Sequence, residues 1–170
     1  MYNSKIIGMG HYVPENIVTN DDLSQLMDTN DQWIQERTGI KQRRWAVKGD
    51  GDTTFSMGLK AAKNAIKNAG IDKQDIDFIV FATLSPDYYF PGPGVQVQAA
   101  LGIDTVGALD VRNQCSGFVY GISVDDQFIK PGMYKHILVI GSELQSRGID
   151  VSTRGRSISV IFGDGAGVAV

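Results

Sequence analysis

The chain lacks the residue patterns of a disulfide-stabilised, membrane-spanning or nucleic-acid-binding protein. It has one cysteine in 170 residues, so no disulfide can form within it. Apolar runs such as 78–82 are far too short to cross a bilayer, and the first residues contain no signal-peptide core. A net charge of -3 at pH 7 gives no reason to expect nucleic acid as a partner. We therefore expect no membrane segment and a location in a reducing cytoplasm.

The composition is that of an ordinary globular protein, with 42% hydrophobic and 21% charged residues. A chain of this length suits one domain with a sizeable core. Strand-like and helix-like segments alternate along it, which predicts a single α/β domain over residues 1–170. The helices are expected after the capping residues 19–22 and over 31–38, 53–69, 96–101 and 115–129. The strands are expected over 5–9, 77–83, 106–111, 136–142, 157–162 and 167–170.

The single cysteine stands at a junction between the expected strand 106–111 and the expected helix from Cys115 onward. Unpaired backbone N–H groups at a helix start stabilise an anion, so a thiol there can ionise to the nucleophilic thiolate. The alternative is that Cys115 is a small core residue, because free cysteines are often buried. Neither His11 nor His136 is an obvious base for it, since each has a simpler polar or edge role.

Several motifs together resemble those of one enzyme family. The run 28–44, DTNDQWIQERTGIKQRR, is similar to a signature of β-ketoacyl-(acyl carrier protein) synthase III. Further matches follow in the same order and cover essentially the whole chain: Phe90-Pro91, Gln98, Leu101-Gly102-Ile103, Cys115-Ser116-Gly117-Phe118, Ile140-Gly141-Ser142-Glu143, Ser146-Arg147 and Phe162-Gly163-Asp164-Gly165-Ala166-Gly167. The order and the length of these motifs make the resemblance specific.

The resemblance implies half of a thiolase-like fold. In that superfamily two similar α/β halves form an α-β-α-β-α unit, and this chain resembles the N-terminal half, a mixed β-sheet covered by helices. The family's chain continues for about as many residues beyond the position of Val170. The histidine and asparagine that complete the family's catalytic centre lie in that second half. We therefore expect this chain to be an N-terminal fragment that is inactive alone.

The activity that the resemblance implies is a decarboxylative condensation. Cys115 takes the acyl group of an acyl-coenzyme A primer, and malonyl-acyl carrier protein then condenses with it, losing CO2, to give a β-ketoacyl product. The Cys115 backbone N–H is expected to contribute to the oxyanion hole. The same resemblance implies a homodimer and no metal. It also implies no cofactor, because coenzyme A takes part as the thioester substrate.

Substrate-binding residues also follow from the resemblance. Trp33 and Arg156 match an aromatic ring and an arginine that sandwich the adenine of coenzyme A, and Thr29 and Arg37 match residues beside that nucleotide. The residues alone make Trp33 a core anchor. Arg154 lies two positions from Arg156, and counting back from Phe162 selects Arg156. The family's usual aspartate before that arginine is Gly155 here.

Two residues match the acyl pocket. Phe90 matches a phenylalanine that crosses the dimer interface and closes the pocket, although ordinary loop packing also explains it. Gln145 stands where an apolar pocket residue is common. An acetyl primer is the default expectation, and a longer, branched or aromatic primer stays open.

Two other functions remain open from sequence. One is an acyltransferase, or a non-decarboxylating condensing relative, from secondary metabolism; the other is a non-catalytic half-domain. A downstream histidine and asparagine separate the enzymes from the half-domain, and product analysis separates the two enzymes. The basic cluster Lys41, Arg43, Arg44 and Lys48 is either a solvated face or a docking patch for the acidic acyl carrier protein.

Overall fold

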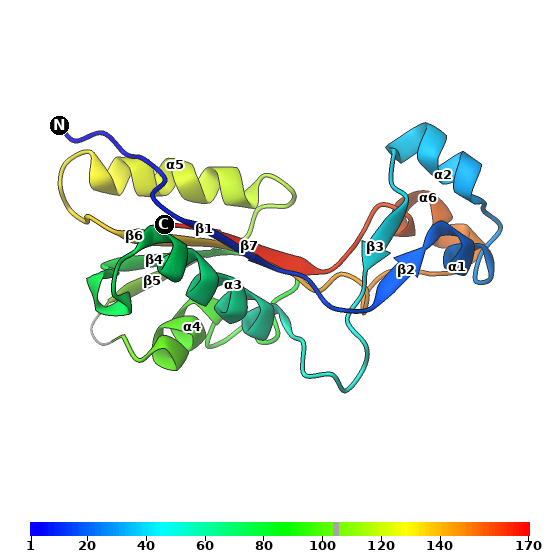
Figure 1. The fold of residues 1–170 in the computed structure, drawn as a ribbon, viewed down its shortest axis with the longest axis horizontal. Coiled ribbons are helices and arrows are strands. Elements are labelled where there is room, and N and C mark those ends of the chain that lie inside the picture. The colour runs from blue at the N-terminus through cyan, green and yellow to red at the C-terminus, as the bar shows by residue number, and fades with distance from the viewer. Residues whose placement is uncertain (104–105) are drawn as a thin grey trace. The chain divides into compact units, whose positions relative to one another are not determined.

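The computed structural model describes residues 1–103 and 106–170 and shows two compact units, each made of separate chain segments. Unit 1 comprises Met1–Tyr12, Thr53–Glu143 and Gly165–Val170, and unit 2 comprises Val13–Asp52 and Leu144–Asp164. Figure 1 shows the elements of both units along the chain. The single domain over 1–170 stays a prediction.

Unit 1 is built on a five-stranded mixed sheet in the order β1-β7-β6-β4-β5. Strands β4, β5 and β6 are parallel, whereas β7 is antiparallel to both β6 and β1. The fold class expected from sequence is therefore confirmed. The elements of unit 1 are β1 (Met9–Tyr12), α3 (Thr54–Ala69), the 3-10 helix η1 (Lys73–Asp75), β4 (Phe78–Ala82), α4 (Pro93–Leu101), β5 (Gly107–Val111), α5 (Gly117–Ile129), β6 (Ile137–Glu143) and β7 (Gly165–Ala169).

Helices cover both faces of this sheet. Helices α3 and α4 lie on one face and α5 lies on the other (Figure 1). Gly121 of α5 approaches Val80 and Val139 so closely that a Cβ there would meet both side chains at 3.1–3.3 Å. On the other face Gly58 of α3 meets Phe81. Strand β4 is thus buried on both sides, which explains its continuous apolar sequence.

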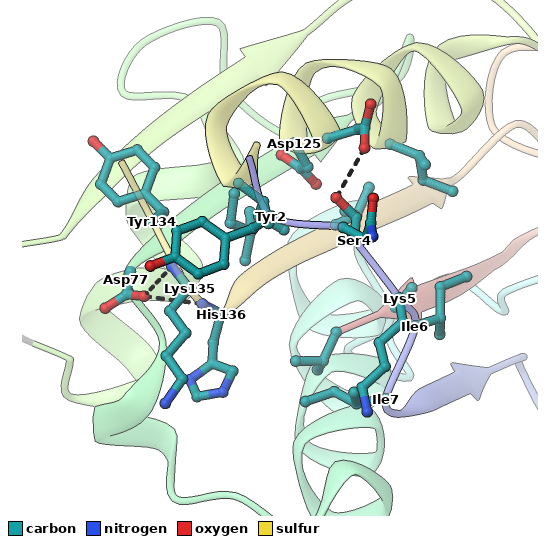
Figure 2. A pocket seen from close by; sticks show the side chains of 18 of the residues that line it. Tyr2, Ser4, Lys5, Ile6, Ile7, Asp77, Asp125, Tyr134, Lys135 and His136 are labelled. Atoms are coloured by element: carbon teal, nitrogen blue, oxygen red, sulfur yellow. Dashed lines mark hydrogen bonds between the residues drawn. The ribbon is translucent and has the colours of Figure 1, made fainter. Parts of the chain in front are cut away.

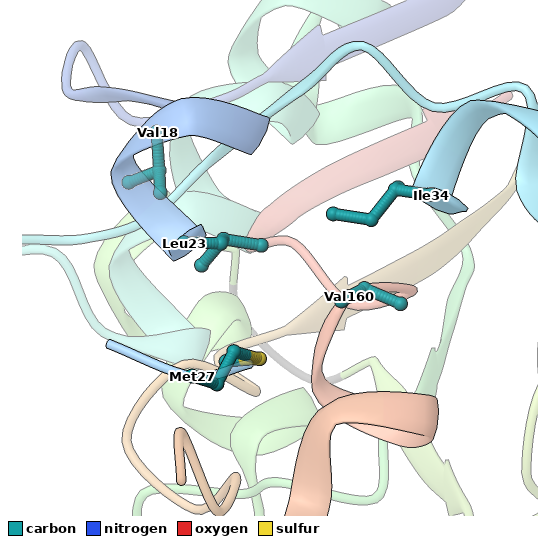
Figure 3. Close-up of a cluster of buried hydrophobic side chains, with 5 residues drawn as sticks. All are labelled: Val18, Leu23, Met27, Ile34 and Val160. Atoms are coloured by element: carbon teal, nitrogen blue, oxygen red, sulfur yellow. The ribbon is translucent and has the colours of Figure 1, made fainter. Parts of the chain in front are cut away.

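Unit 2 is a small assembly of short elements around its own core. The elements are β2 (Ile17–Thr19), α1 (Asn20–Ser24), α2 (Asp31–Thr38), β3 (Gln42–Arg44), η2 (Thr153–Gly155) and α6 (Arg156–Ser159), with β2 and β3 forming a two-stranded antiparallel sheet. Figure 3 shows the core cluster of Val18, Leu23, Met27, Ile34 and Val160.

Hydrogen bonds join the two chain segments of unit 2. The buried Arg43 donates to the carbonyls of Val18 at 3.3 Å and Val160 at 3.0 Å. Trp45 Nε1 donates to the Phe162 carbonyl at 3.0 Å. The Asp164 carboxylate accepts from the Ala46 N–H at 2.8 Å. Because the segments are far apart in sequence, these bonds define the unit more than any local motif does.

The helix predictions hold best. Helix α2 spans the predicted residues, and Gly39 ends it with a φ of 71°. Thr53 caps α3 through its side chain.

Two strand predictions differ from the structure. Residues 157–162 form no strand, because α6 and the turn after it place Val160 in the unit 2 core and its carbonyl on Arg43. Strand β1 begins at Met9 rather than at residue 5. Ile7 and Gly8 do bond Val170, but the regular ladder starts at Met9. The three-residue strands β2 and β3 were not predicted.

Candidate functional site

The carboxyl ends of β4, β5 and β6 meet at one edge of the unit 1 sheet because these strands are parallel. From β5 the chain enters the turn that carries Cys115, and from β4 it enters the segment that carries Phe90. Helix α4 links β4 to β5 on one face, and α5 links β5 to β6 on the other (Figure 1). The connection after β4 therefore lies on one face of the sheet and the connection after β5 on the other. α/β sheets bind ligands at the carboxyl edge, where the connections switch face in this way.

Cys115 is exposed on this edge, in a turn closed by the Gly117 N–H bonding the Gln114 carbonyl at 3.0 Å. Helix α5 begins at Gly117, so the cysteine precedes the helix by two residues and does not start it as expected. The N-cap, Ser116, makes no side-chain capping bond. The first N–H groups of this 13-residue helix are therefore not capped by that side chain and can stabilise a thiolate beside them.

Aromatic side chains stand beside the cysteine turn. Tyr88, Tyr89 and Phe90 follow β4 and are strongly exposed, Phe90 at 93%. The Arg112 guanidinium carbon lies 4.8 Å from the centre of the Tyr89 ring. Since Arg112 is three residues before Cys115, this contact links the aromatic segment to the turn. Sequence reasoning did not single out Arg112.

A second cluster, in unit 2, joins three of the predicted nucleotide residues. The Trp33 ring lies under the guanidinium carbons of Arg37 at 4.4 Å and Arg156 at 4.9 Å. Trp33 is half-buried and packs against the unit 2 core, so its interpretation as a core anchor also holds. We call Trp33, Arg37 and Arg156 the tryptophan cluster.

The structure separates the two candidate arginines. Arg156 donates to the backbone carbonyl of Asp28 and lies 3.7 Å from its carboxylate. Arg154 instead pairs with Asp150 at 2.8 Å. The Ser152 hydroxyl above all, with Arg154, holds the pKa of Asp150 at about 2. Asp28 was missed by sequence reasoning, although it opens the DT pair of the recognised signature.

The other predicted residues are placed as follows. The Thr29 hydroxyl oxygen is buried in unit 2 and has no hydrogen-bond partner among the described residues. Gln145 also lies in unit 2, where its backbone carbonyl accepts from the Gly148 N–H at 2.9 Å. Phe90 and Cys115 lie in unit 1.

The predicted basic patch does not exist as a surface of four cations. Arg43 is only 6% exposed, and burial lowers the pKa of its guanidinium. Arg44 is half-buried and donates to the carbonyls of Pro14 and Glu15. Of the four, Lys41 and Lys48 are exposed.

A cavity of about 950 Å³ lies in unit 1 toward the other end of α5 (Figure 2). Asp125 lines it, is 5% exposed, and has no hydrogen-bond partner on either carboxylate oxygen among the described residues. Burial raises the pKa of Asp125 to about 7. Its spacing from Ile122 and Ile129 put it on the apolar side of the helix, a pattern visible in the sequence. The cavity is separate from the cysteine turn, which precedes α5.

Residues 1–103 and 106–170 contain neither a metal-binding cluster nor a membrane-spanning helix. No group of three or more His, Cys, Asp or Glu side chains is placed to hold a metal ion in this part of the chain. In the same residues no helix is both long enough and apolar enough to cross a membrane.

Known proteins similar to this chain in sequence and fold include β-ketoacyl-[acyl-carrier-protein] synthases. The family model for 3-oxoacyl-[acyl-carrier-protein] synthase III matches residues 109–170. A β-ketoacyl-[acyl-carrier-protein] synthase III of Vibrio vulnificus is 50% identical over 167 residues, covering 98% of this chain and 52% of its own. The crystal structure of the synthase III from Aquifex aeolicus superimposes with a TM-score of 0.92 at 45% identity, covering 97% of this chain and 52% of that one.

A third similarity is to the priming β-ketosynthase of the R1128 polyketide pathway, with a TM-score of 0.91, 34% identity and coverage of 97% of this chain and 48% of that one. The fold therefore matches half of the thiolase fold of these enzymes. The chain spans about half the length of the curated relatives it matches. It is a homologue of β-ketoacyl-[acyl-carrier-protein] synthase III and corresponds to the N-terminal half.

Proposed function

We propose that this chain is the part of a β-ketoacyl-acyl carrier protein synthase III that carries the nucleophile. The Cys115 thiolate attacks the thioester carbonyl of an acyl-coenzyme A, and collapse of the tetrahedral intermediate releases the coenzyme A thiolate and leaves an acyl-cysteine. Malonyl-acyl carrier protein then loses CO2, and its carbanion takes the acyl group from the cysteine. Homology to the family supports this order of steps.

The observation that carries the proposal is the position of Cys115. Its side chain is exposed at the carboxyl edge of three parallel strands, directly before a helix whose N-cap makes no side-chain bond. A structural cysteine is expected to be buried in a core instead. The Cys115 backbone N–H is proposed as an oxyanion donor. The base and the second donor are proposed to come from the other half of the complete enzyme.

The tryptophan cluster is proposed to bind the adenine of coenzyme A. Two van der Waals contacts of a flat base need about 7 Å between its neighbours, and Arg156 lies only 4.9 Å from the Trp33 ring centre. Arg156 must therefore swing away from Trp33 for the base to enter between them. Arg156 also contacts Asp28, and this contact is either lost or kept when Arg156 moves. Thr29 and Arg37 are proposed to lie beside the same nucleotide.

The remaining parts of the proposal concern partners. Phe90 and Gln145 are proposed acyl-pocket residues, and the enzyme is proposed to be a homodimer that acts with an acyl carrier protein in the cytoplasm. Of the basic cluster Lys41, Arg43, Arg44 and Lys48, the exposed Lys41 and Lys48 are proposed to attract the acidic acyl carrier protein.

The proposal is tested by intact-mass analysis of the complete protein, with both halves, after incubation with a series of acyl-coenzyme A thioesters. A mass increase equal to one acyl group, located on Cys115, supports it. An unchanged mass with every thioester rejects it. The 170-residue chain alone should form no β-ketoacyl product, and measurable product would contradict the assignment of the base to the other half.

A second candidate function, the priming of a polyketide pathway, has a specific observation in its favour. The structural similarity to a priming ketosynthase of a polyketide pathway extends over 97% of this chain. For a polyketide-type enzyme we expect a primer that is longer or more varied than acetate. The acylation series separates the two candidate functions, because a preference for acetyl-coenzyme A supports the fatty-acid role. A transfer that occurs without CO2 release supports an acyltransferase.

A further inference from the structure

The segment Leu84–Gly94, which we call the aromatic loop, leaves three consecutive aromatic side chains in water. Tyr88, Tyr89 and Phe90 are 65%, 80% and 93% exposed. Exposed apolar area of this kind marks an interaction site. Because the largest side chains of the loop are barely buried, other contacts must hold it in one conformation.

Glu143 fixes the beginning of the loop. It ends β6, next to the end of β4, because Gly141 pairs with Ala82 in the sheet. One carboxylate oxygen accepts from the Leu84 N–H at 2.7 Å. The other accepts from the Ser85 N–H at 3.1 Å and from the Thr83 and Ser85 hydroxyl groups. Bonds to an ionised carboxylate are stronger than bonds between neutral groups, so this corner is firmly held.

Asp87 fixes the middle of the loop. Its two carboxylate oxygens accept from the N–H groups of Thr54 at 3.2 Å and Phe55 at 2.7 Å, the first residues of α3. The Thr54 hydroxyl donates back to the Ser85 carbonyl at 2.5 Å. A carboxylate at a helix N-terminus is also favoured by the helix dipole. The residue directly before Tyr88 is thus fixed to a 16-residue helix.

Asp110 of β5 fixes the end of the loop. It accepts from the Gly94 N–H at 2.9 Å, and the carboxylate stands so close to Gly92 that no side chain fits there. Glu143 and Asp110 hold the loop through its backbone N–H and hydroxyl groups, and Asp87 ties it to the start of α3. None of these bonds uses an aromatic side chain, so they leave Tyr88 and Phe90 exposed, while Tyr89 contacts Arg112.

The fixed loop stands beside the nucleophile. Arg112 on the Cys115 turn covers the Tyr89 ring, and both segments start from neighbouring strand ends at the carboxyl edge. Phe90 of this loop is a proposed acyl-pocket residue, so a displacement of the loop moves a proposed wall of that pocket. Misplacement of such walls by about 1 Å changes rates by orders of magnitude.

We propose that Glu143 and Asp87 are positioning residues that set the longest acyl group the enzyme accepts, by fixing the aromatic loop. The inference rests on the proposed function, because it needs acylation of Cys115. A loop held by hydrogen bonds to carboxylates at three points resists displacement by a longer chain, so chain-length discrimination is a property of its anchors as well as of Phe90.

The test compares Glu143→Gln and Asp87→Asn with the matched control Asp77→Asn in the complete protein. Asp77 also anchors backbone, accepting from the N–H groups of Lys135 at 2.7 Å and His136 at 2.9 Å, but it stands before β4 at the opposite edge of the sheet. The readout is the ratio of the Cys115 acylation rates with octanoyl- and acetyl-coenzyme A. Hydrogen exchange at the Leu84 and Ser85 amides reports loop fixation independently of chemistry.

We expect both anchor variants to shift the ratio toward octanoyl by roughly 10-fold. In Glu143→Gln, exchange at Leu84 and Ser85 should accelerate, and Asp77→Asn should leave the ratio unchanged at a similar loss of thermal stability. An unchanged ratio together with faster exchange overturns the inference and leaves the proposed function intact. No acylation of the unmodified protein rejects both. If Glu143→Gln does not fold, Ser85→Ala removes one donor, keeps the carboxylate, and must shift the ratio in the same direction.

Discussion

The cysteine turn of unit 1 and the tryptophan cluster of unit 2 are built in different ways. The turn is local: strand β5, three connecting residues and Cys115 follow one another in sequence, and helix α5 comes directly after. The tryptophan cluster joins residues more than a hundred positions apart, since Arg156 contacts Asp28 and Trp33. The position of Cys115 therefore depends mainly on neighbouring residues, whereas the tryptophan cluster depends on the contacts that join its two chain segments.

The first way to separate the two regions is Cys115→Ala in the complete enzyme. Acyl transfer to the protein should fall by more than about 10³-fold, because the nucleophilic sulfur is gone. Affinity for coenzyme A, measured by calorimetry, should stay unchanged, because the tryptophan cluster is intact. Acylation of the variant seen by mass spectrometry would place the nucleophile elsewhere.

The second test concerns the pH dependence of unit 1. The folded pKa of Asp125 is raised from 3.8 to about 7, so between these values the folded chain binds more protons than the unfolded one. Stability should therefore fall as pH rises from 4 to 7, by at most about 4 kcal/mol. Urea unfolding at several pH values checks this, and Asp125→Asn should flatten the dependence.

Asp126 provides the matched control for Asp125. Hydrogen bonds from Lys130 and then Ser4 lower its pKa, so its contribution has the opposite sign and is lost as pH falls. Asp126→Asn should keep the fall in stability between pH 4 and 7. If both variants behave alike, burial of Asp125 is not the cause.

The third test breaks the connection within unit 2. Arg43→Met removes the donors to the Val18 and Val160 carbonyls, which are buried with it. We expect a loss of about 3 kcal/mol in the free energy of unfolding. Coenzyme A affinity should fall with it, since Arg156 begins the helix that Val160 follows. The exposed Lys41→Met should change stability by less than about 0.5 kcal/mol. Equal effects of the two variants would show that Arg43 holds nothing together.

The smallest expected effect distinguishes the two arginines near the tryptophan cluster. Arg156→Ala should weaken coenzyme A binding by about 10-fold, because one cation–π partner of the base is lost. Arg154→Ala removes only the exposed pair with Asp150 and should leave binding unchanged. Calorimetric titration of the complete protein measures both. A larger effect from Arg154 would reverse the assignment.

Helices were easier to predict than short strands. Capping residues and Gly39 mark both ends of α2 within the sequence, so its bounds were predictable. Residues 157–160 alternate polar and apolar side chains as a strand does, and 161–162 are apolar, yet the segment forms the end of α6 and a turn. Whether such a segment becomes a strand depends on pairing with another strand, and in unit 2 the described strands β2 and β3 pair with each other while Val160 packs into the core.

The candidate site shows the same division. The position of Cys115 after an apolar strand and before an apolar helix was visible in the sequence, and only its offset of two residues from the helix was not. The choice between Arg154 and Arg156 needed coordinates, because two residues of offset decide which guanidinium reaches Trp33. The loop anchors Glu143 and Asp87 were not predictable, since Glu143 reaches the loop through the pairing of β6 with β4 and Asp87 bonds the distant start of α3.

The sequence by itself determined the longer helices, most strands of the unit 1 sheet, their order and the residue that bears the thiol, because capping, periodicity and apolar runs act over a few neighbouring positions. Tertiary structure alone decided which distant side chains meet: Arg156 on Trp33, Arg43 on Val160, and three carboxylates on one loop. Those contacts follow from strand order and register, which depend on long-range pairing that no local pattern encodes.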